Sequence, residues 1–229
     1  MSATSVGASQ VGAAELLGIE HGADHRSTLV LGDLGKRNAL STELAEALKD
    51  AIDHLPAETK VVALRSSGPV FCSGADLKGG SGGVAVAIRA IVECPVPVVA
   101  EVSGPALGAG VSLIAFATYA LMAEEAWCSL PEVEKLGRFP TGVAAELSPL
   151  SGMRLLSDVA VTGRRLPGRE VVAAGWATAA HPRGELPAAV DALTAGLAAH
   201  PRDVLVQLQE SWRRWLRSVG ATAALLEAR

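Results

Sequence analysis

The chain has 229 residues, of which 49% are hydrophobic and 19% are charged, and its formal net charge is −4. That length is enough for one large domain with a substantial apolar core, and the composition excludes an intrinsically disordered chain. The sequence has no basic run and no interleaving of basic with aromatic residues, so it lacks the charge pattern of a nucleic-acid-binding protein.

The N-terminal segment predicts no export or membrane signal. Residues 1–14 contain neither a positively charged stretch nor an apolar one, which predicts a flexible leader. The longest apolar stretch, residues 111–123, is too short to span a bilayer, so we expect no membrane partner.

The three cysteines, Cys72, Cys94 and Cys128, show neither Cys-x-x-Cys nor His-Cys spacing. They predict reduced thiols in a cytoplasmic protein, without a metal site.

The first half of the chain alternates strands with helices. Residues 17–21 and 27–31 predict a hairpin, and Ser41 is a good N-cap for the amphipathic helix that follows it. The predicted strands are 17–21, 27–31, 60–65, 98–102, 119–123 and 126–129, and the predicted helices are 41–55, 84–93 and 108–117. This alternation indicates an α/β fold with a largely parallel sheet.

From residue 141 onward the pattern is almost entirely helical. The predicted helices are 147–160, 168–174, 186–200 and 202–218. The proline-flanked stretch at 182–187 is the best candidate boundary, which divides the chain into an α/β core over 15–182 and a C-terminal helical region over 183–229.

Two short segments carry most of the functional information. Residues 71–77 (FCSGADL) and 106–112 (ALGAGVS) are small-residue turns, each close after a predicted buried strand. Gly and Ala allow the backbone to approach a ligand closely, so an N–H group in each turn can point at one carbonyl oxygen. Two such groups form an oxyanion hole. The alternative is two ordinary tight turns between core elements. The glycine-rich residues 78–83 predict a mobile loop beside the first turn.

The sequence does not fit the motifs of dinucleotide-binding proteins, serine hydrolases or metal sites. The spacing of Gly104, Gly108 and Gly110 differs from the dinucleotide-binding G-x-G-x-x-G pattern. Neither Ser73 nor Ser112 lies in the G-x-S-x-G frame of a hydrolase nucleophile. The five histidines fall at predicted turns or helix ends, so they do not suggest a metal site.

Several segments, in this order, resemble the motifs of the crotonase (enoyl-CoA hydratase/isomerase) superfamily. They are residues 36–40 (KRNAL), 71–77, 97–110 (PVVAEVSGPALGAG), 130–140 (LPEVEKLGRFP) and 155–175. The resemblance covers residues 16–182 and implies a crotonase-like ββα spiral core followed by the helical region. It also implies an acyl-CoA thioester substrate, no cofactor beyond the coenzyme A of that substrate, a role in lipid metabolism, and a homotrimer or dimer of trimers.

The resemblance assigns roles to individual residues. The amides of Ala75 and Ala109 would form the oxyanion hole for a thioester enolate, Glu132 would move the proton, and Lys36 and Arg37 would face the phosphates of coenzyme A. The other substrate-binding positions that it implies are Ala39, Ser73, Gly74, Asp76, Leu77, Gly108, Gly110 and Ser112. The alternatives are a solvated turn for the two cations and an ordinary loop residue for Glu132.

This chain departs from the family pattern in ways that affect the reaction. Family hydratases have a first glutamate where this chain has Ser112, which we expect to cap or pack a helix start. A single glutamate favours double-bond isomerisation over hydration. One extra residue after Glu132 leaves open whether Glu132 or Glu134 faces the site. The missing glutamate at position 112, the insertion after Glu132 and the early end at Arg229 keep open a third reading, a non-catalytic accessory subunit that binds CoA thioesters. The short glycine-rich stretch between Leu77 and Pro97 predicts a reduced or mobile wall of the acyl pocket.

Overall fold

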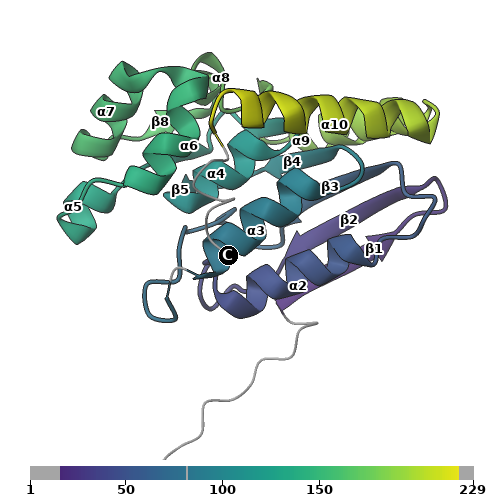
Figure 1. Cartoon of the computed structure of the whole chain (residues 1–229), viewed down its shortest axis with the longest axis horizontal. Helices are drawn as coiled ribbons and strands as arrows, with labels where there is room; N and C mark the ends of the chain where they lie inside the picture. The colour runs from purple at the N-terminus through teal and green to yellow at the C-terminus, as the bar shows by residue number, and fades with distance from the viewer. Residues whose placement is uncertain (1–15, 81, 222–229) are drawn as a thin grey trace, which may run out of the picture.

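The computed structural model describes residues 16–80 and 82–221, so the predicted leader at 1–14 lies outside the described residues. The strands are β1 Leu17–His21, β2 Arg26–Leu31, β3 Val61–Ser66, β4 Val98–Val102, β5 Ala106–Leu107, β6 Tyr119–Ala123, β7 Trp127–Ser129, β8 Leu166–Pro167 and β9 Ala179–His181. The helices are α2 Thr42–Asp53, α3 Gly82–Glu93, α4 Ala109–Phe116, α5 Glu132–Leu136, α6 Thr141–Ser151, α7 Met153–Thr162, α8 Gly168–Ala173, α9 Leu186–Ala198 and α10 Arg202–Ser218. Figure 1 shows their arrangement.

The larger sheet is the centre of the fold. Its six strands lie in the order β1-β2-β3-β4-β6-β9, with β1 antiparallel to β2 and every other neighbouring pair parallel. Helices α2 and α3 lie in front of this sheet in Figure 1, and α9 packs against β2, β3, β4 and β6. Strand β4 is buried at four of its five positions, as expected for a parallel strand covered on both faces. The predicted α/β class is therefore confirmed.

Local sequence signals explain most of the elements. The Ser41 side chain caps α2 by accepting a hydrogen bond of 3.2 Å from the Leu44 amide. Leu44, Leu48 and Ile52 recur at helical spacing and form the buried face of that helix. The predicted strands at 17–21, 98–102 and 119–123 and the helix at 202–218 have the observed bounds.

The region after residue 141 differs from the prediction. The single helix predicted over 147–160 is wrong, because α6 and α7 are separate helices divided at Gly152, whose φ of 76° ends the first one. Strands β8 and β9 also interrupt the predicted run of helices. Strand β9 is only three residues long and is defined by its parallel pairing with β6, so no local alternation marked it.

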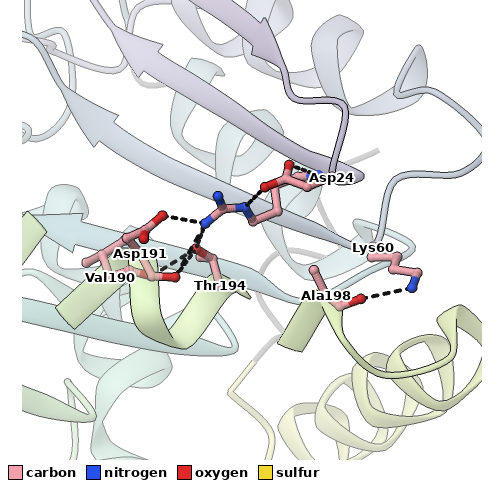
Figure 2. A network of polar contacts seen from close by, with 7 residues as sticks. Asp24, Lys60, Val190, Asp191, Thr194 and Ala198 are labelled. Atoms are coloured by element: carbon pink, nitrogen blue, oxygen red, sulfur yellow. Dashed lines mark hydrogen bonds and ion pairs between the residues drawn. The ribbon is translucent and has the colours of Figure 1, made fainter. Parts of the chain in front are cut away.

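Polar contacts attach α9 to one end of the sheet (Figure 2). The Arg26 guanidinium lies 2.5 Å from both the Asp24 and the Asp191 carboxylate, and it also donates a hydrogen bond of 3.0 Å to Thr194. The Lys60 ammonium donates to the carbonyl of Ala198 at 2.8 Å. These groups are partly exposed, so each ion pair contributes about 1 kcal/mol at most.

The opposite part of the molecule holds the smaller sheet and three consecutive helices. The smaller sheet has the order β5-β7-β8, and α5, α6 and α7 (green in Figure 1) gather at one end of the molecule. The segments that leave β3 and β4 run toward this region, and ligands of open parallel sheets bind beyond the carboxyl ends of the strands. No helix in residues 16–80 and 82–221 is long and apolar enough to cross a membrane.

Candidate active site

The two small-residue turns lie side by side. The Phe71 amide donates to the carbonyl of Pro105 at 2.9 Å, and the Leu107 amide donates to the carbonyl of Cys72 at 3.0 Å. Cys72 and Ala106 also form an isolated parallel bridge. The two turns follow the neighbouring parallel strands β3 and β4, and these backbone hydrogen bonds extend that pairing beyond the sheet. Segments that are distant in sequence therefore form one surface.

The segment at 36–40 supports the first turn. The Ser73 amide donates to the carbonyl of Arg37 at 3.1 Å, and the Leu40 amide donates to the carbonyl of Gly74 at 2.7 Å. Asn38 is fully buried, and its side-chain amide donates to the carbonyl of Phe71 at 3.1 Å. This segment and the first turn are thus held together by main-chain and side-chain hydrogen bonds.

Ala75 and Ala109 both line one cleft of about 1200 Å³. Within the part of the chain that the structure describes, no hydrogen bond uses either N–H group. A Cβ atom placed on Gly74 would lie 3.6 Å from the Ala109 nitrogen, so the first turn reaches the start of α4. Ala109 is the first residue of α4, where amides have no partner within the helix and carry its positive dipole end.

Glu132 lies beside the second turn. A Cβ atom on Gly108, whose φ is 50°, would be 2.5 Å from Glu132 Oε1, so the carboxylate fills the space that a side chain at 108 would need. Glu132 Oε2 is buried without a hydrogen-bond partner among the described residues, and burial raises the pKa of this carboxyl. Glu134, in contrast, is exposed and lies 2.6 Å from the Lys135 ammonium. Of the two glutamates, Glu132 is the one that lines the cleft.

A second glutamate among the cleft-lining residues comes from α6. Glu146 lines the cleft although only 4% of its surface is exposed, and it accepts a hydrogen bond of 2.5 Å from the Ser112 hydroxyl. Burial raises the pKa of Glu146 to about 7, and the Ser112 hydrogen bond opposes that rise. The sequence reasoning missed Glu146, since no motif marks it. The one available signal was Ser112, a hydroxyl in a buried apolar helix that needs a polar partner.

Cationic side chains surround the cleft. They are Arg37, Arg89, Lys135, Arg138 and Arg165. The Arg165 guanidinium lies 4.1 Å from the centroid of the Trp127 ring, which also lines the cleft. Such a group of cations suits an anionic ligand such as a phosphate.

Lys36 has a different place from the one that the sequence implied. It does not belong to the cleft lining, and its ammonium lies 3.0 Å from the Asp76 carboxylate. Lys36 holds the pKa of Asp76 below its usual value, helped by hydrogen bonds from the amides of Lys78 and Gly79. Lys36 and Asp76 therefore brace the loop after the first turn, while Arg37 lines the cleft.

Comparison with known proteins gives the family. Residues 30–229 match the sequence model described as enoyl-CoA hydratase/isomerase. The chain belongs to this family. The mitochondrial methylglutaconyl-CoA hydratase of Homo sapiens is 34% identical over 170 residues, which are 66% of this chain and 50% of that protein. The mitochondrial enoyl-CoA hydratase domain-containing protein 3 of Danio rerio is 30% identical over 165 residues, 66% of this chain and 57% of that protein.

Solved structures agree with the family and its fold. An enoyl-CoA hydratase of Mycobacterium smegmatis superimposes with a TM-score of 0.82 and 25% identity, covering 91% of this chain and 88% of that one. The human enoyl coenzyme A hydratase domain-containing protein 3 superimposes with a TM-score of 0.79 at 23% identity. The crotonase fold is therefore shown. The chain spans about half the length of the mammalian methylglutaconyl-CoA hydratases that it matches.

The other positions that the family motifs implied divide into two sets. Ser73, Gly74, Leu77 and Gly108 line the cleft with Ala75, Ala109, Arg37 and Glu132. Ala39, Asp76, Gly110 and Ser112 are buried and are not part of its lining. Gly110 packs against the first turn, because a Cβ atom there would lie 2.7 Å from the Cys72 carbonyl oxygen. Residues of this second set are thus packed beneath the cleft surface and do not face the cleft.

No cysteine or histidine is among the described residues that line the cleft. All three cysteines are buried and free, and burial raises the pKa of Cys72 to about 12, so its thiol is not a nucleophile at neutral pH. Among the residues that the structure describes, no group of three or more His, Cys, Asp and Glu side chains is placed to hold a metal ion.

The buried Glu146 predicts a specific pH dependence of stability. Its folded pKa of about 7 exceeds the reference value of 4.5, so the folded state holds the proton more tightly. The protonated Glu146 contributes to the free energy of unfolding, and this contribution is complete below the pKa of the unfolded state. It is lost as the pH rises through the folded-state pKa, and the loss is about 3 kcal/mol. Glu146→Gln has no titratable group at this position and should not show this loss. Urea unfolding at about pH 5 and about pH 8 should show the variant gaining stability relative to wild type at the higher pH. An equal difference at both pH values would contradict the raised pKa.

Proposed function

We propose that this chain binds an acyl-CoA and forms a thioester enolate that is stabilised by the amides of Ala75 and Ala109. The observation that carries the proposal is that Ala75, Ala109 and Glu132 line one cleft. Among residues 16–80 and 82–221, the two alanine N–H groups and the buried Oε2 atom of Glu132 have no hydrogen-bond partner. Donors aimed at a developing oxyanion are the main contribution of such a site to catalysis. Family membership supports the thioester substrate.

The proposed roles follow from the chemistry of a thioester. Hydrogen bonds to the carbonyl oxygen acidify the α-carbon, because the negative charge that forms on removing a proton is held on that oxygen. Glu132, in its ionised form, takes the α-proton. A raised pKa suits this role, since a base with a pKa nearer to neutral transfers the proton with less penalty in each direction. The cations around the cleft, Arg37 among them, would hold the phosphates of coenzyme A.

Enolate chemistry at this site can serve two reactions, isomerisation and hydration. In isomerisation, Glu132 takes a proton from the α-carbon of a 3-enoyl thioester and returns it to the γ-carbon, so that the double bond moves and one carboxylate suffices. Ser112, in place of the glutamate of family hydratases, favours this reaction. Hydration of a 2-enoyl thioester needs a second acid–base group, and Glu146 in the same cleft favours that candidate. The relatives reported above are named for hydratases.

The proposal includes an assembly and a compartment. The family resemblance suggests a homotrimer or dimer of trimers, and the three widely spaced cysteines suggest the cytoplasm.

The decisive experiment is turnover of defined substrates. Purified protein should convert short-, medium- or long-chain 2-enoyl-CoA or 3-enoyl-CoA, followed by the absorbance of the conjugated thioester and by mass spectrometry. Binding of these thioesters without turnover, measured by calorimetry, would contradict the enzymatic proposal and indicate a CoA-thioester-binding accessory subunit.

A further inference from the structure

The Glu146–Ser112 pair is a buried polar contact that isomerisation through Glu132 does not use. Its two members come from α4 and α6, and their 2.5 Å hydrogen bond is buried. A carboxylate in an apolar interior is costly unless it has polar partners or loses its charge. Glu146 nevertheless belongs to the residues that line the cleft, beside the space where an acyl chain would lie.

The two carboxylates reach the cleft at different depths along α4. Glu132 lies against Gly108, the N-cap of α4, which precedes Ala109 in the chain. Ser112 is three residues after Ala109, and three residues of an α-helix rise about 4.5 Å, close to one turn. The carboxylate that Ser112 holds therefore lies about one helical turn beyond the level of Glu132.

This offset would place the two carboxylates at successive positions along an acyl chain whose carbonyl oxygen is bound at the Ala109 amide. A carbonyl oxygen bound at the Ala109 amide brings the adjacent α-carbon to the level of Glu132. The β-carbon is one bond farther from the carbonyl and reaches toward the Glu146 carboxylate. Water that bridges Glu146 and the β-carbon would be in position to add.

We propose that Glu146 is the second acid–base group of this site, that Ser112 positions it, and that the pair makes the chain a hydratase. This inference rests on the proposed enolate chemistry and extends it by naming the reaction and the group that activates water. A buried hydroxyl on α4 and a glutamate on α6 together do the work of one carboxylate at position 112.

The proposed step balances atoms and charge. Glu146 accepts one proton from water while the water oxygen bonds to the β-carbon. The π electrons of the double bond move to form the enolate, whose oxygen is held by the amides of Ala75 and Ala109. Protonated Glu132 then delivers its proton to the α-carbon and restores the thioester carbonyl. The product is the 3-hydroxyacyl thioester, and a proton returns from Glu146 to Glu132 through solvent to complete the cycle.

The charged surroundings of Glu146 determine its protonation. Helix α4 contributes no charged side chain, and α7 contributes Arg154 and Asp158, both exposed, of which Asp158 is ion-paired with Arg164. The charged groups that share the cleft are Arg37, Arg89, Glu132, Lys135, Arg138 and Arg165. The pKa of Glu146, about 7, reflects burial first and the Ser112 hydrogen bond second. As a base Glu146 must be ionised, so hydration should fall as the pH drops below about neutral.

The test compares two reactions of the same protein. One is hydration of short-, medium- and long-chain 2-enoyl-CoA. The other is exchange of the α-protons of the matching saturated acyl-CoA in deuterium oxide, which needs the enolate and Glu132 but no added water. Glu146→Gln should lower hydration by about 100-fold or more, while α-proton exchange stays within about threefold of wild type. Glu134→Gln, the same change at an exposed position outside the cleft lining, should leave both reactions unchanged.

Ser112→Ala tests the positioning role. Ser112 donates to the carboxylate and so lowers its pKa, and its removal should move the acid limb of the hydration profile to higher pH. An acid limb that stays in place would show that Ser112 does not act on the catalytic group. Thermal unfolding of Glu146→Gln and Ser112→Ala shows whether each variant is folded before its rates are compared.

The possible results separate this inference from the proposed function. Hydration by Glu146→Gln at the wild-type rate would overturn the role of Glu146, and so would equal loss of hydration and exchange. Wild-type protein that exchanges α-protons but never hydrates would overturn this inference and leave the enolate proposal intact. Wild-type protein that does neither would overturn both.

Discussion

Glu132→Gln is expected to lower α-proton exchange and turnover of enoyl-CoA substrates by about 1000-fold. The variant keeps the size of the side chain but replaces the proton-accepting carboxylate by a neutral amide. Glu132 Oε2 is buried without a partner among the described residues, so the change breaks no protein hydrogen bond at that atom and the fold should tolerate it. The measurement is kcat and KM with 2-enoyl- and 3-enoyl-CoA, together with acyl-CoA binding by calorimetry, which should change little.

The exposed neighbour provides the matched control for this prediction. Glu134 belongs to the same helix, α5, and is paired with Lys135 at the surface. Glu134→Gln should retain wild-type rates. If Glu132→Gln retained them instead, or if Glu134→Gln lost them, the carboxylate of Glu132 would not be the group that moves the proton.

Ala109→Pro is expected to reduce enolate formation by about 100- to 1000-fold, the loss typical when one oxyanion-hole donor is removed. Proline lacks an N–H group, and Ala109 is the first residue of α4. That helical position is the one where proline is best tolerated, because the N–H there has no partner within the helix. The substitution therefore removes the proposed donor, and also fills part of its space, without breaking a helical hydrogen bond.

Ala109→Gly is the matched control, since it changes the side chain but keeps the amide N–H. It should retain α-proton exchange within about tenfold of wild type, with a stability loss of about 1 kcal/mol at most. Wild-type exchange by Ala109→Pro would contradict the role of this amide. Equal losses in both variants would assign the effect to the geometry of the helix start.

Sequence patterns predicted the elements whose signals are local. The hairpin β1–β2, the capped helix α2 and the buried strand β4 each follow from alternation, an N-cap or a run of apolar residues. Strand β9 exists only because it pairs with β6, and the break between α6 and α7 depends on the positive φ of Gly152. Neither feature has a periodicity that sequence reasoning can detect.

The candidate site likewise contains residues that local sequence patterns predicted and residues that only the folded structure brings into place. The small residues of the two turns and the proline-glutamate pair at 131–132 were visible in the sequence, and the structure brings them to one cleft. Lys36 was assigned to phosphates from its position in a motif, but its ion pair with Asp76 depends on the folded loop. Glu146 was missed because the contact with Ser112 joins two helices that no local pattern connects.

The function of Ser112 illustrates why the residue at one position is a weak guide to the reaction. Its identity alone indicates a lost carboxylate and hence a site with one glutamate. Its hydrogen bond to Glu146 shows that a carboxylate is present at that place and comes from another element. The chemistry of a site is set by the groups that reach it in space, from whichever segment they come.

The carbonyl stretching frequency of a bound thioester tests the oxyanion hole most directly. Saturated acyl-CoA labelled with carbon-13 at the carbonyl should show, by infrared difference spectroscopy, a shift to lower frequency when bound to wild-type protein. Binding to Ala109→Gly should preserve that shift, and the remaining amide in Ala109→Pro should give a smaller one. A bound thioester whose carbonyl frequency equals that of the free compound would contradict polarisation by the amides of Ala75 and Ala109.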